Sequence, residues 1–374
     1  MGCGPSPKFA RMATVPPPPT SAQKNRWAPR WLAFVACLNL AFALLLLLAL
    51  RHVGEANHGL ALLLFVPPAL WLLPTLLLLP LALIWSWRSL PLLAVAATVV
   101  VVPFMGWRPD PGPSPAEAYA APSLIVMTWN RGQHGGQSLQ PFKRQQQPDL
   151  LVLQEATYQD RAMTGAPGYR EFDHGLSAGE HTLLSKFPIL ESSLLPAGAT
   201  PREARAARFV VNWNGRRIAV YSVHLHTPRE VLLGQWKGGL PYGLLGFPGT
   251  PWAERSEQYQ VFWDGQLADA QKILEAVRRD PLPALVAGDF NSPHTGLIRH
   301  RLTRVLGDAH AEAGAGFGFT FPGKTRNPFS AGGPWLRIDY IFFTRQWSAM
   351  TCSTEAERAS QHRAVAARLA LTAP

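Results

Sequence analysis

Three long apolar stretches within the first 107 residues constrain the fold of this chain more than any other feature. Residues 31–50, 59–87 and 89–107 contain no charged side chain. A helix of about 20 apolar residues crosses the hydrocarbon core of a bilayer. The sequence therefore predicts three transmembrane helices within residues 31–107, with two or four as the alternatives. The four prolines of the second stretch would break a helix in water, but neighbouring helices in a membrane can satisfy the freed backbone groups.

The basic residues that flank these stretches predict an orientation. Five basic residues precede the first stretch and Arg88 separates the second from the third, whereas only Arg51 and Arg108 flank the opposite ends. Because basic residues accumulate on the cytoplasmic side of a membrane, we expect a basic, proline-rich cytoplasmic tail at residues 1–30. The C-terminal region is then expected outside the cytoplasm. Residues 108–122 contain five prolines and predict a stiff linker to a folded domain at residues 123–374.

The C-terminal domain has the pattern of an α/β fold. Short apolar segments predict strands at residues 124–129, 150–153, 209–213, 216–221, 284–287 and 336–343. The continuous apolar runs among them are typical of strands buried on both faces, and Asn214-Gly215 favours a tight hairpin turn. Thr250 and Pro251 predict the start of a helix whose Leu267, Ala270, Leu274 and Val277 share one face. Strands, hairpin and amphipathic helices together predict two sheets between layers of helices.

Polar side chains close or begin the predicted strands. Asparagine, glutamate, histidine and aspartate occupy these positions, at Asn130, Glu155, His224, Asp289, Asn291, Asp339 and His362. A single buried carboxylate among them would be an ordinary core residue. Burying all of these polar groups at separate places, however, would cost several kcal/mol for each group without a partner. Carboxylate and amide oxygens suit Mg²⁺, and histidines can donate to phosphoryl oxygens. The set therefore predicts one site for a hard cation and a phosphate.

At these positions the sequence resembles the endonuclease/exonuclease/phosphatase superfamily, which has the deoxyribonuclease-I-like fold. The motifs that carry the resemblance are Met127-Thr128-Trp129-Asn130, Leu153-Gln154-Glu155, Ser222-Val223-His224-Leu225, Gly288-Asp289-Phe290-Asn291, Arg337-Ile338-Asp339-Tyr340 and Ser360-Gln361-His362. The resemblance covers residues 123–371. It implies a four-layer α-β-β-α sandwich that hydrolyses phosphoric esters.

The resemblance also implies a metal site. Glu155 corresponds to the principal Mg²⁺ ligand, and Asn130 lies near metal and phosphate. The family usually has aspartate where this chain has Gln361. A glutamine offers a carbonyl oxygen but no charge, so we expect weaker Mg²⁺ affinity or tolerance of Mn²⁺ rather than loss of activity.

The remaining positions imply catalytic roles. His224 would contact the phosphate. Asp289 would orient or deprotonate the attacking water, or protonate the leaving oxygen. Asn291 would hold Asp289 in place. Asp339 would pair with His362 and raise the pKa of its imidazole, so that an imidazolium faces the transition state. In-line displacement at phosphorus needs charge neutralisation and an aligned water more than covalent chemistry.

Residues 231–252 form an unusual segment with six glycines and a single charge, Lys237. Its aromatic rings are of the kind that favours the lipid headgroup level, although packing back on its own domain is the favoured explanation. The sequence thus predicts an integral membrane protein that is a Mg²⁺-dependent phosphohydrolase, with phosphodiesters favoured. Its substrate would be a phospholipid or sphingolipid headgroup, nucleic acid or a small phosphate ester. The alternative is a catalytically weakened module that binds phosphorylated ligands at the membrane, and no protein partner can be inferred.

Overall fold

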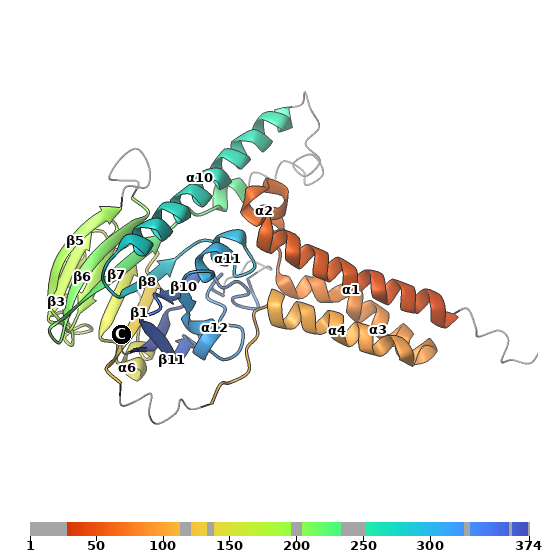
Figure 1. The fold of residues 1–374 in the computed structure, drawn as a ribbon, viewed down its shortest axis with the longest axis horizontal. Helices are drawn as coiled ribbons and strands as arrows, with labels where there is room; N and C mark the ends of the chain where they lie inside the picture. The colour runs from red at the N-terminus through yellow and green to blue at the C-terminus, as the bar shows by residue number, and fades with distance from the viewer. Residues whose placement is uncertain are drawn as a thin grey trace, which may run out of the picture.

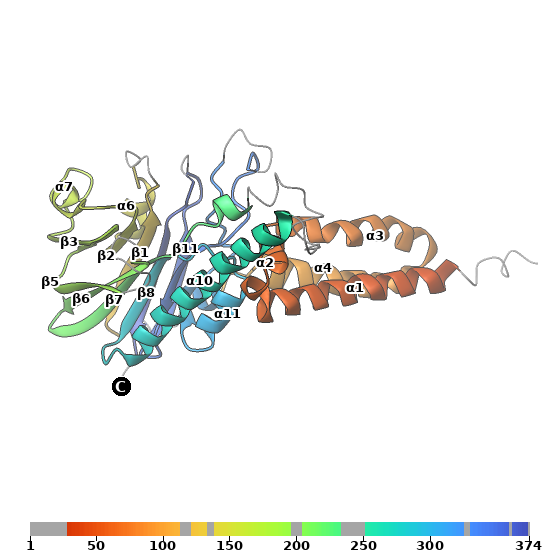
Figure 2. The same ribbon diagram turned by 90° about the horizontal axis from the view of Figure 1, so that it is seen from above.

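The computed structural model describes residues 28–112, 121–132, 138–195, 204–232, 251–324, 330–358 and 361–372. An N-terminal helical bundle projects from a C-terminal body built of two β-sheets and their covering helices (Figure 1 and Figure 2).

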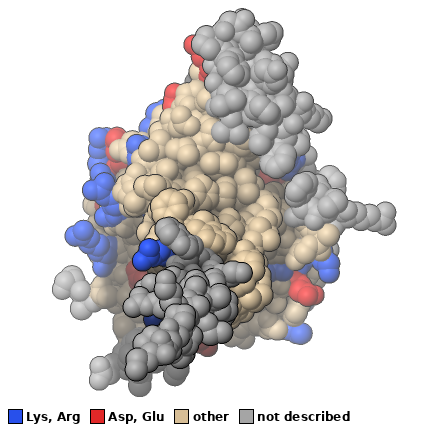
Figure 3. Space-filling model, turned by 90° about the vertical axis from the view of Figure 1, so that its right-hand side faces the viewer, with Lys and Arg blue, Asp and Glu red and all other residues tan. Residues whose placement is uncertain are grey.

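The bundle contains three helical segments that are long and apolar enough to cross a membrane, at Arg30–His52, Pro68–Trp85 and Trp87–Phe104. They correspond to α1 (Ala28–His52), to η3 (Pro68–Leu72) with α3 (Leu73–Trp85), and to η4 (Trp87–Ser89) with α4 (Leu90–Val99) and η5 (Val100–Phe104). Large apolar side chains point outward, including Leu77 at 70% and Ile84 at 71% exposed. Viewed along the bundle in Figure 3, the described central surface is mostly uncharged and the charged side chains lie around it.

The second segment begins later than the sequence predicts. Residues 59–64 belong to a separate short helix, α2 (His58–Leu64), which Asn57 caps by accepting a hydrogen bond from the Leu60 amide. Pro67 and Pro68 end it, because a residue before proline is pushed out of the helical region and Pro67 has an extended ψ of 117°. After α2, the Phe65 ring stacks on Trp263 of the C-terminal domain, with centroids 6.0 Å apart.

The turn between α1 and α2 is bonded directly to the C-terminal domain. Within η2 (Gly54–Ala56), the buried Glu55 accepts hydrogen bonds from Ser292 Oγ at 2.5 Å and from the Leu297 amide at 2.6 Å, at the start of α11 (Leu297–Thr303). Burial raises the pKa of the Glu55 carboxyl, against the opposing effect of these hydrogen bonds. Further along, Arg108 and Gly316 exchange two backbone hydrogen bonds of 2.9 Å. The bundle is thus attached at points far apart in the sequence.

Glu55→Ala is expected to lower the free energy of unfolding by about 2–4 kcal/mol, because two buried donors lose their acceptor. Glu55→Gln keeps the shape and an acceptor, so it should cost much less. A carboxyl with a raised folded pKa gives up its proton more easily when unfolded, so the free energy of unfolding of the native protein falls as pH rises above about 4.5. Glu55→Gln has no carboxyl to titrate, so its free energy of unfolding should rise relative to that of the native protein between pH 5 and pH 8. Chemical unfolding of the detergent-solubilised chain at pH 5 and at pH 8 measures these free energies. Equal losses of stability for Glu55→Ala and Glu55→Gln at both pH values would contradict the prediction.

The two sheets have six strands each and form the two inner layers. The first has the order β11-β12-β1-β2-β4-β3 and the second β5-β6-β7-β8-β10-β9. Their bounds are β1 Ser123–Asn130, β2 Leu150–Gln154, β3 His174–Ala178, β4 His181–Ser185, β5 Ile189–Leu195, β6 Ala206–Trp213, β7 Arg216–His224, β8 Ala284–Asp289, β9 Gly307–Asp308, β10 Asp339–Phe343, β11 Trp347–Thr354 and β12 Val365–Leu371. The predicted strand at 336–343 is shorter than expected, because Leu336 instead bridges Phe321 in a separate loop.

Helices cover the outer faces of both sheets. On the first sheet lie α6 (Phe142–Gln146) and α7 (Asp160–Met163), whose Phe142 and Met163 join the cluster of residues behind β1 and β2. On the second lie α10 (Pro251–Arg279) and α11, and α12 (Ala309–Ala313) follows β9. The predicted apolar face of α10 packs there, with Leu267, Ala270, Leu274 and Val277 all buried. The predicted four-layer α-β-β-α sandwich is therefore confirmed.

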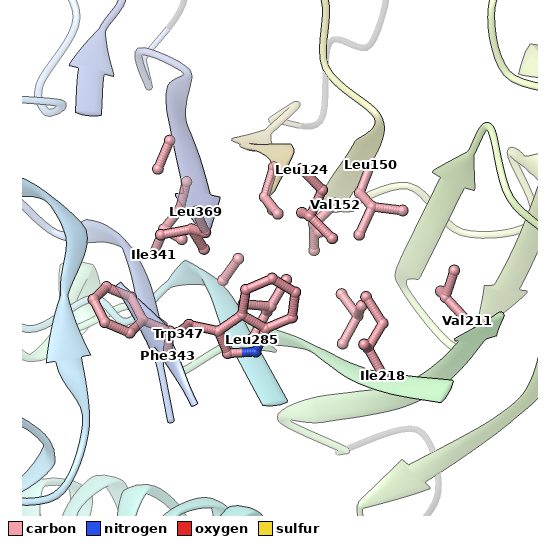
Figure 4. Close-up of a cluster of buried hydrophobic side chains, with 14 of the residues drawn as sticks. Leu124, Leu150, Val152, Val211, Ile218, Leu285, Ile341, Phe343, Trp347 and Leu369 are labelled. Atoms are coloured by element: carbon pink, nitrogen blue, oxygen red, sulfur yellow. The ribbon is translucent and has the colours of Figure 1, made fainter. Parts of the chain in front are cut away.

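The main core fills the space between the sheets. Leu124, Val152, Ile218, Leu285 and Ile341 meet there (Figure 4). All five residues of β2 and all six of β8 are buried, as their continuous apolar runs predict. This core fixes the two sheets face to face, and so brings the polar ends of their strands to one edge.

Candidate active site

Strand pairing gathers the predicted polar residues at one edge of the sandwich. β1 and β2 run parallel with Asn130 opposite Gln154, and β7 and β8 run parallel with His224 opposite Asp289. β10 runs antiparallel to β8, which places Asp339 opposite Asp289. The carboxyl ends of four strands and the start of a fifth therefore meet.

Asp289 lies at the centre of this edge and is 1% exposed. Its Oδ2 accepts a hydrogen bond from Asn130 Nδ2 at 3.0 Å, and its Oδ1 accepts one from the Asn291 amide at 2.9 Å. The Nε2 atoms of His362 and His224 lie 3.7 and 3.8 Å from Oδ2. Burial raises the pKa of Asp289 even though both histidines oppose the shift.

His362 is held between two carboxylates. Its Nδ1 lies 3.1 Å from Asp339 Oδ2, so its Nε2 faces Asp289. Burial alone would lower the pKa of the imidazole, but the charges of Asp339 and Asp289 outweigh it and raise the pKa to about 9. The ring is therefore an imidazolium at neutral pH.

His224 is held from the other side by a residue that the sequence did not single out. Its Nδ1 lies 3.0 Å from Glu180 Oε1, in the turn between β3 and β4. Burial lowers the pKa of His224, but the Glu180 hydrogen bond and the charge of Asp289 outweigh it, and the pKa is raised. No local sequence pattern singles out Glu180, which directly precedes the strand that begins at His181.

A buried polar layer lies beneath the site. His181 Nδ1 is 2.8 Å from Ser222 Oγ, which also accepts a hydrogen bond from Gln154 Nε2 at 3.1 Å. Burial lowers the pKa of His181 to about 4, so this ring is neutral. The layer ties the first sheet to the second just below the predicted residues.

Glu155 and Asn130 lie beside His224, and Asn130 Oδ1 also accepts a hydrogen bond from the Gly132 amide at 2.9 Å. Glu155 Oε1 and Asn130 Nδ2 lie 4.0 and 3.5 Å from His224 Nε2. Glu155 has a left-handed backbone, with φ of 51°, which costs energy for a residue of this kind and is found at functional sites. A carboxylate and an amide oxygen at a partly open position fit Mg²⁺.

A second group could also hold a metal, because ligand atoms of Asp289, Asp339 and His362 lie within 4.8 Å of one another. In this group Asp339 already pairs with His362, whose Nδ1 lies 3.1 Å from Asp339 Oδ2. The Glu155 and Asn130 position is therefore the better match for a hard cation.

Gln361 lies at the outer rim of the site. It is exposed, and its Oε1 accepts a hydrogen bond from Arg229 Nη2 at 3.1 Å. Arg229 is another site residue that the sequence did not single out.

Most of the unusual segment 231–252 lies outside the described residues.

Comparisons with known proteins fit this geometry. A model of the Endonuclease/Exonuclease/phosphatase family matches residues 127–362. A search of curated proteins gave no match.

Several solved structures are similar at low identity. Humanized D. rerio TDP2 is 12% identical, with a TM-score of 0.47 over 66% of this chain and 98% of that one. An endonuclease/exonuclease/phosphatase family protein from Bacteroides thetaiotaomicron is 18% identical, with a TM-score of 0.46 over 68% and 99%. The 3′ phosphatase NExo from Neisseria, bound to a product DNA hairpin, is 18% identical, with a TM-score of 0.42 over 65% and 98%.

Proposed function

Because the chain belongs to the endonuclease/exonuclease/phosphatase family of phosphoester hydrolases, we propose that it is a membrane-anchored, Mg²⁺-dependent phosphodiesterase. The observation that carries this proposal is the buried Asp289 carboxylate, with two histidine nitrogens within 3.8 Å. One carboxylate and two donors at a common point are what an in-line attack on phosphorus requires.

Each residue has a definite part in the proposed reaction. Asp289 accepts the proton of the attacking water, and its raised pKa makes it a better base near neutral pH. Asn291 fixes that carboxylate through its amide. His362, held by Asp339, and His224 donate to the phosphoryl oxygens, where negative charge develops.

Glu155 and Asn130 would hold the cation, Mg²⁺ or Mn²⁺, which would neutralise charge on the phosphate. Gln361 would add its carbonyl oxygen, which accepts a hydrogen bond from Arg229 Nη2 in the structure. The absence of a charge there is expected to weaken Mg²⁺ binding without abolishing activity.

Gln361→Asp is expected to tighten the apparent Mg²⁺ affinity by about tenfold, because a carboxylate adds a unit of charge at the site. Arg229 would compete with the metal for the new carboxylate, because its Nη2 lies 3.1 Å from Gln361 Oε1 in the native protein. The double variant Gln361→Asp/Arg229→Gln should therefore show the larger gain in apparent Mg²⁺ affinity. Mg²⁺ and Mn²⁺ titrations of diester hydrolysis measure both. Unchanged affinity in both variants would place Gln361 away from the metal.

For the membrane topology, we propose that the bundle spans a bilayer with the N-terminus in the cytoplasm and the catalytic domain on the other side. Support comes from three segments of suitable length and composition and from the unequal distribution of basic residues around them. The candidate substrates are a lipid headgroup and nucleic acid.

A substrate panel tests the activity. The full chain in detergent is incubated with bis(4-nitrophenyl) phosphate, plasmid DNA, sphingomyelin, phosphatidylinositol and phosphomonoesters, each with Mg²⁺, Mn²⁺ or EDTA. We expect hydrolysis of the soluble diester that stops in EDTA. Binding of phosphorylated ligands without turnover in every arm would instead support the non-catalytic module.

A further inference from the structure

A cavity of about 410 Å³ opens beside the active site at the end of β11. One wall carries the rings of Phe317 and Phe319, which stack with centroids 5.0 Å apart and an angle of 8°. The polar part of the lining comes from Ser353, Thr354, Glu355 and Arg363. Its volume is within the roughly 300–1,000 Å³ of ligand sites, and none of the roles proposed above uses it.

The cavity adjoins the catalytic histidine. Arg363 directly follows His362 in the chain, and its amide donates to the Thr320 carbonyl at 2.9 Å, next to the phenylalanine wall. The Phe321 ring lies 5.0 Å from the His362 ring. The lining of the cavity thus includes the residue that directly follows His362.

The same cavity adjoins the end of the helical bundle. Gly316, between the two wall residues Ala315 and Phe317, exchanges both backbone hydrogen bonds with Arg108. Arg108 follows the last membrane-length segment, which ends at Phe104, by four residues. In Figure 1 and Figure 2, β11 lies on the bundle side of β1. The cavity thus lies between the catalytic centre and the bundle.

The phenylalanine wall is held in place by close packing. Gly314 and Gly318 lie against the His310 ring, where an added Cβ would come within 1.9 and 2.5 Å of its nitrogens. Gly314 also bridges Cys352 of β11. Only glycine allows this approach, so the cavity is formed before any ligand arrives.

The lining has the chemistry of the region between a lipid headgroup and its acyl chains. Two stacked rings offer an apolar face, and Ser353, Thr354 and Glu355 add polar groups to the lining. The half-buried Arg363 guanidinium interacts electrostatically with Glu355, which also lines the cavity, and with Glu357. Its N–H groups can still donate to ester carbonyl oxygens.

We propose that this cavity binds the glycerol-ester region and the first acyl carbons of a membrane phospholipid whose phosphate lies at His362 and Asp289. This inference rests on the proposed phosphodiesterase function and names its substrate class. A nucleobase could also stack on phenylalanine, but the bond between Gly316 and Arg108 places the wall next to the bundle, which favours lipid.

The test uses Phe317→Ala/Phe319→Ala in the full chain. Substrates are vesicles of mixed phosphatidylcholine, phosphatidylethanolamine and phosphatidylglycerol, monomeric dihexanoyl phosphatidylcholine, a single-stranded oligonucleotide and bis(4-nitrophenyl) phosphate. We expect kcat/KM to fall by at least about tenfold on both lipid substrates, because two apolar contacts are lost. The kcat/KM of this variant on the soluble diester should stay within about twofold of the native value. Leu190→Ala, which removes an exposed apolar side chain from β5, is the matched control. It should change kcat/KM neither on the lipid substrates nor on the soluble diester.

Arg363→Gln is the second variant and should show the same selective loss on lipids. Loss on all four substrates in both variants would indicate a structural role and overturn the inference. Selective loss on the oligonucleotide would assign the cavity to nucleobases, which also overturns it. If the native chain hydrolyses only the soluble diester, the lipid inference fails while the phosphodiesterase function stands. If it hydrolyses nothing with any metal, the proposed function itself fails.

Discussion

Replacing Asp289 with asparagine is expected to lower kcat for diester hydrolysis by about 10³- to 10⁴-fold, the scale of losing a general base. The amide keeps the size of the side chain but cannot take the proton of the attacking water. It also offers one acceptor oxygen where the carboxylate accepts from both Asn130 and Asn291. Single-turnover assays on the soluble diester at saturating Mg²⁺ measure the change.

The matched control is Asp269→Asn, which removes a carboxylate from α10, where it pairs with Lys272 at 3.8 Å. Its kcat and its thermal unfolding should match those of the native chain. The Asp289 variant should unfold within a few degrees of the native protein, so that the loss belongs to chemistry. Activity within tenfold of native for Asp289→Asn would remove Asp289 from the role of base.

The second large effect concerns His362 and Asp339. His362→Gln and Asp339→Asn are each expected to lower kcat by about 10²- to 10³-fold, because either change removes the imidazolium from its position. The double variant should be no worse than the poorer single variant, since the two residues act as a unit. A double-mutant cycle on kcat measures the coupling. Additive losses would mean that His362 acts without the Asp339 contact seen at 3.1 Å.

The sequence predicted most of the fold because its signals were local. Continuous apolar runs identified β2 and β8, which are buried along their whole length. The catalytic edge followed from the same runs, since parallel strands carry their carboxyl ends to one side. That rule brought His224 and Asp289 together within the second sheet, whereas Asn130 of the first sheet reaches Asp289 because the two sheets pack face to face.

The residues that the sequence missed depend on contacts between distant segments. Glu180 meets His224 only because the two sheets pack face to face. Glu55 reaches Ser292 across 237 positions, and no local pattern distinguishes it from a charge in a short loop. The late start of the second bundle segment has a local cause, Pro67 and Pro68, although in a membrane bundle neighbouring helices are expected to compensate for the prolines of this segment.

The attachment of the bundle through Glu55 and Arg108 has a kinetic consequence. If the bundle spans a bilayer as proposed, a catalytic body fixed to it cannot reach far into the surrounding fluid, and it keeps one orientation toward the bilayer surface. In the proposed topology its encounters with substrate occur by lateral diffusion in two dimensions. Its turnover would then follow the number of substrate molecules per unit area of membrane and not their bulk concentration.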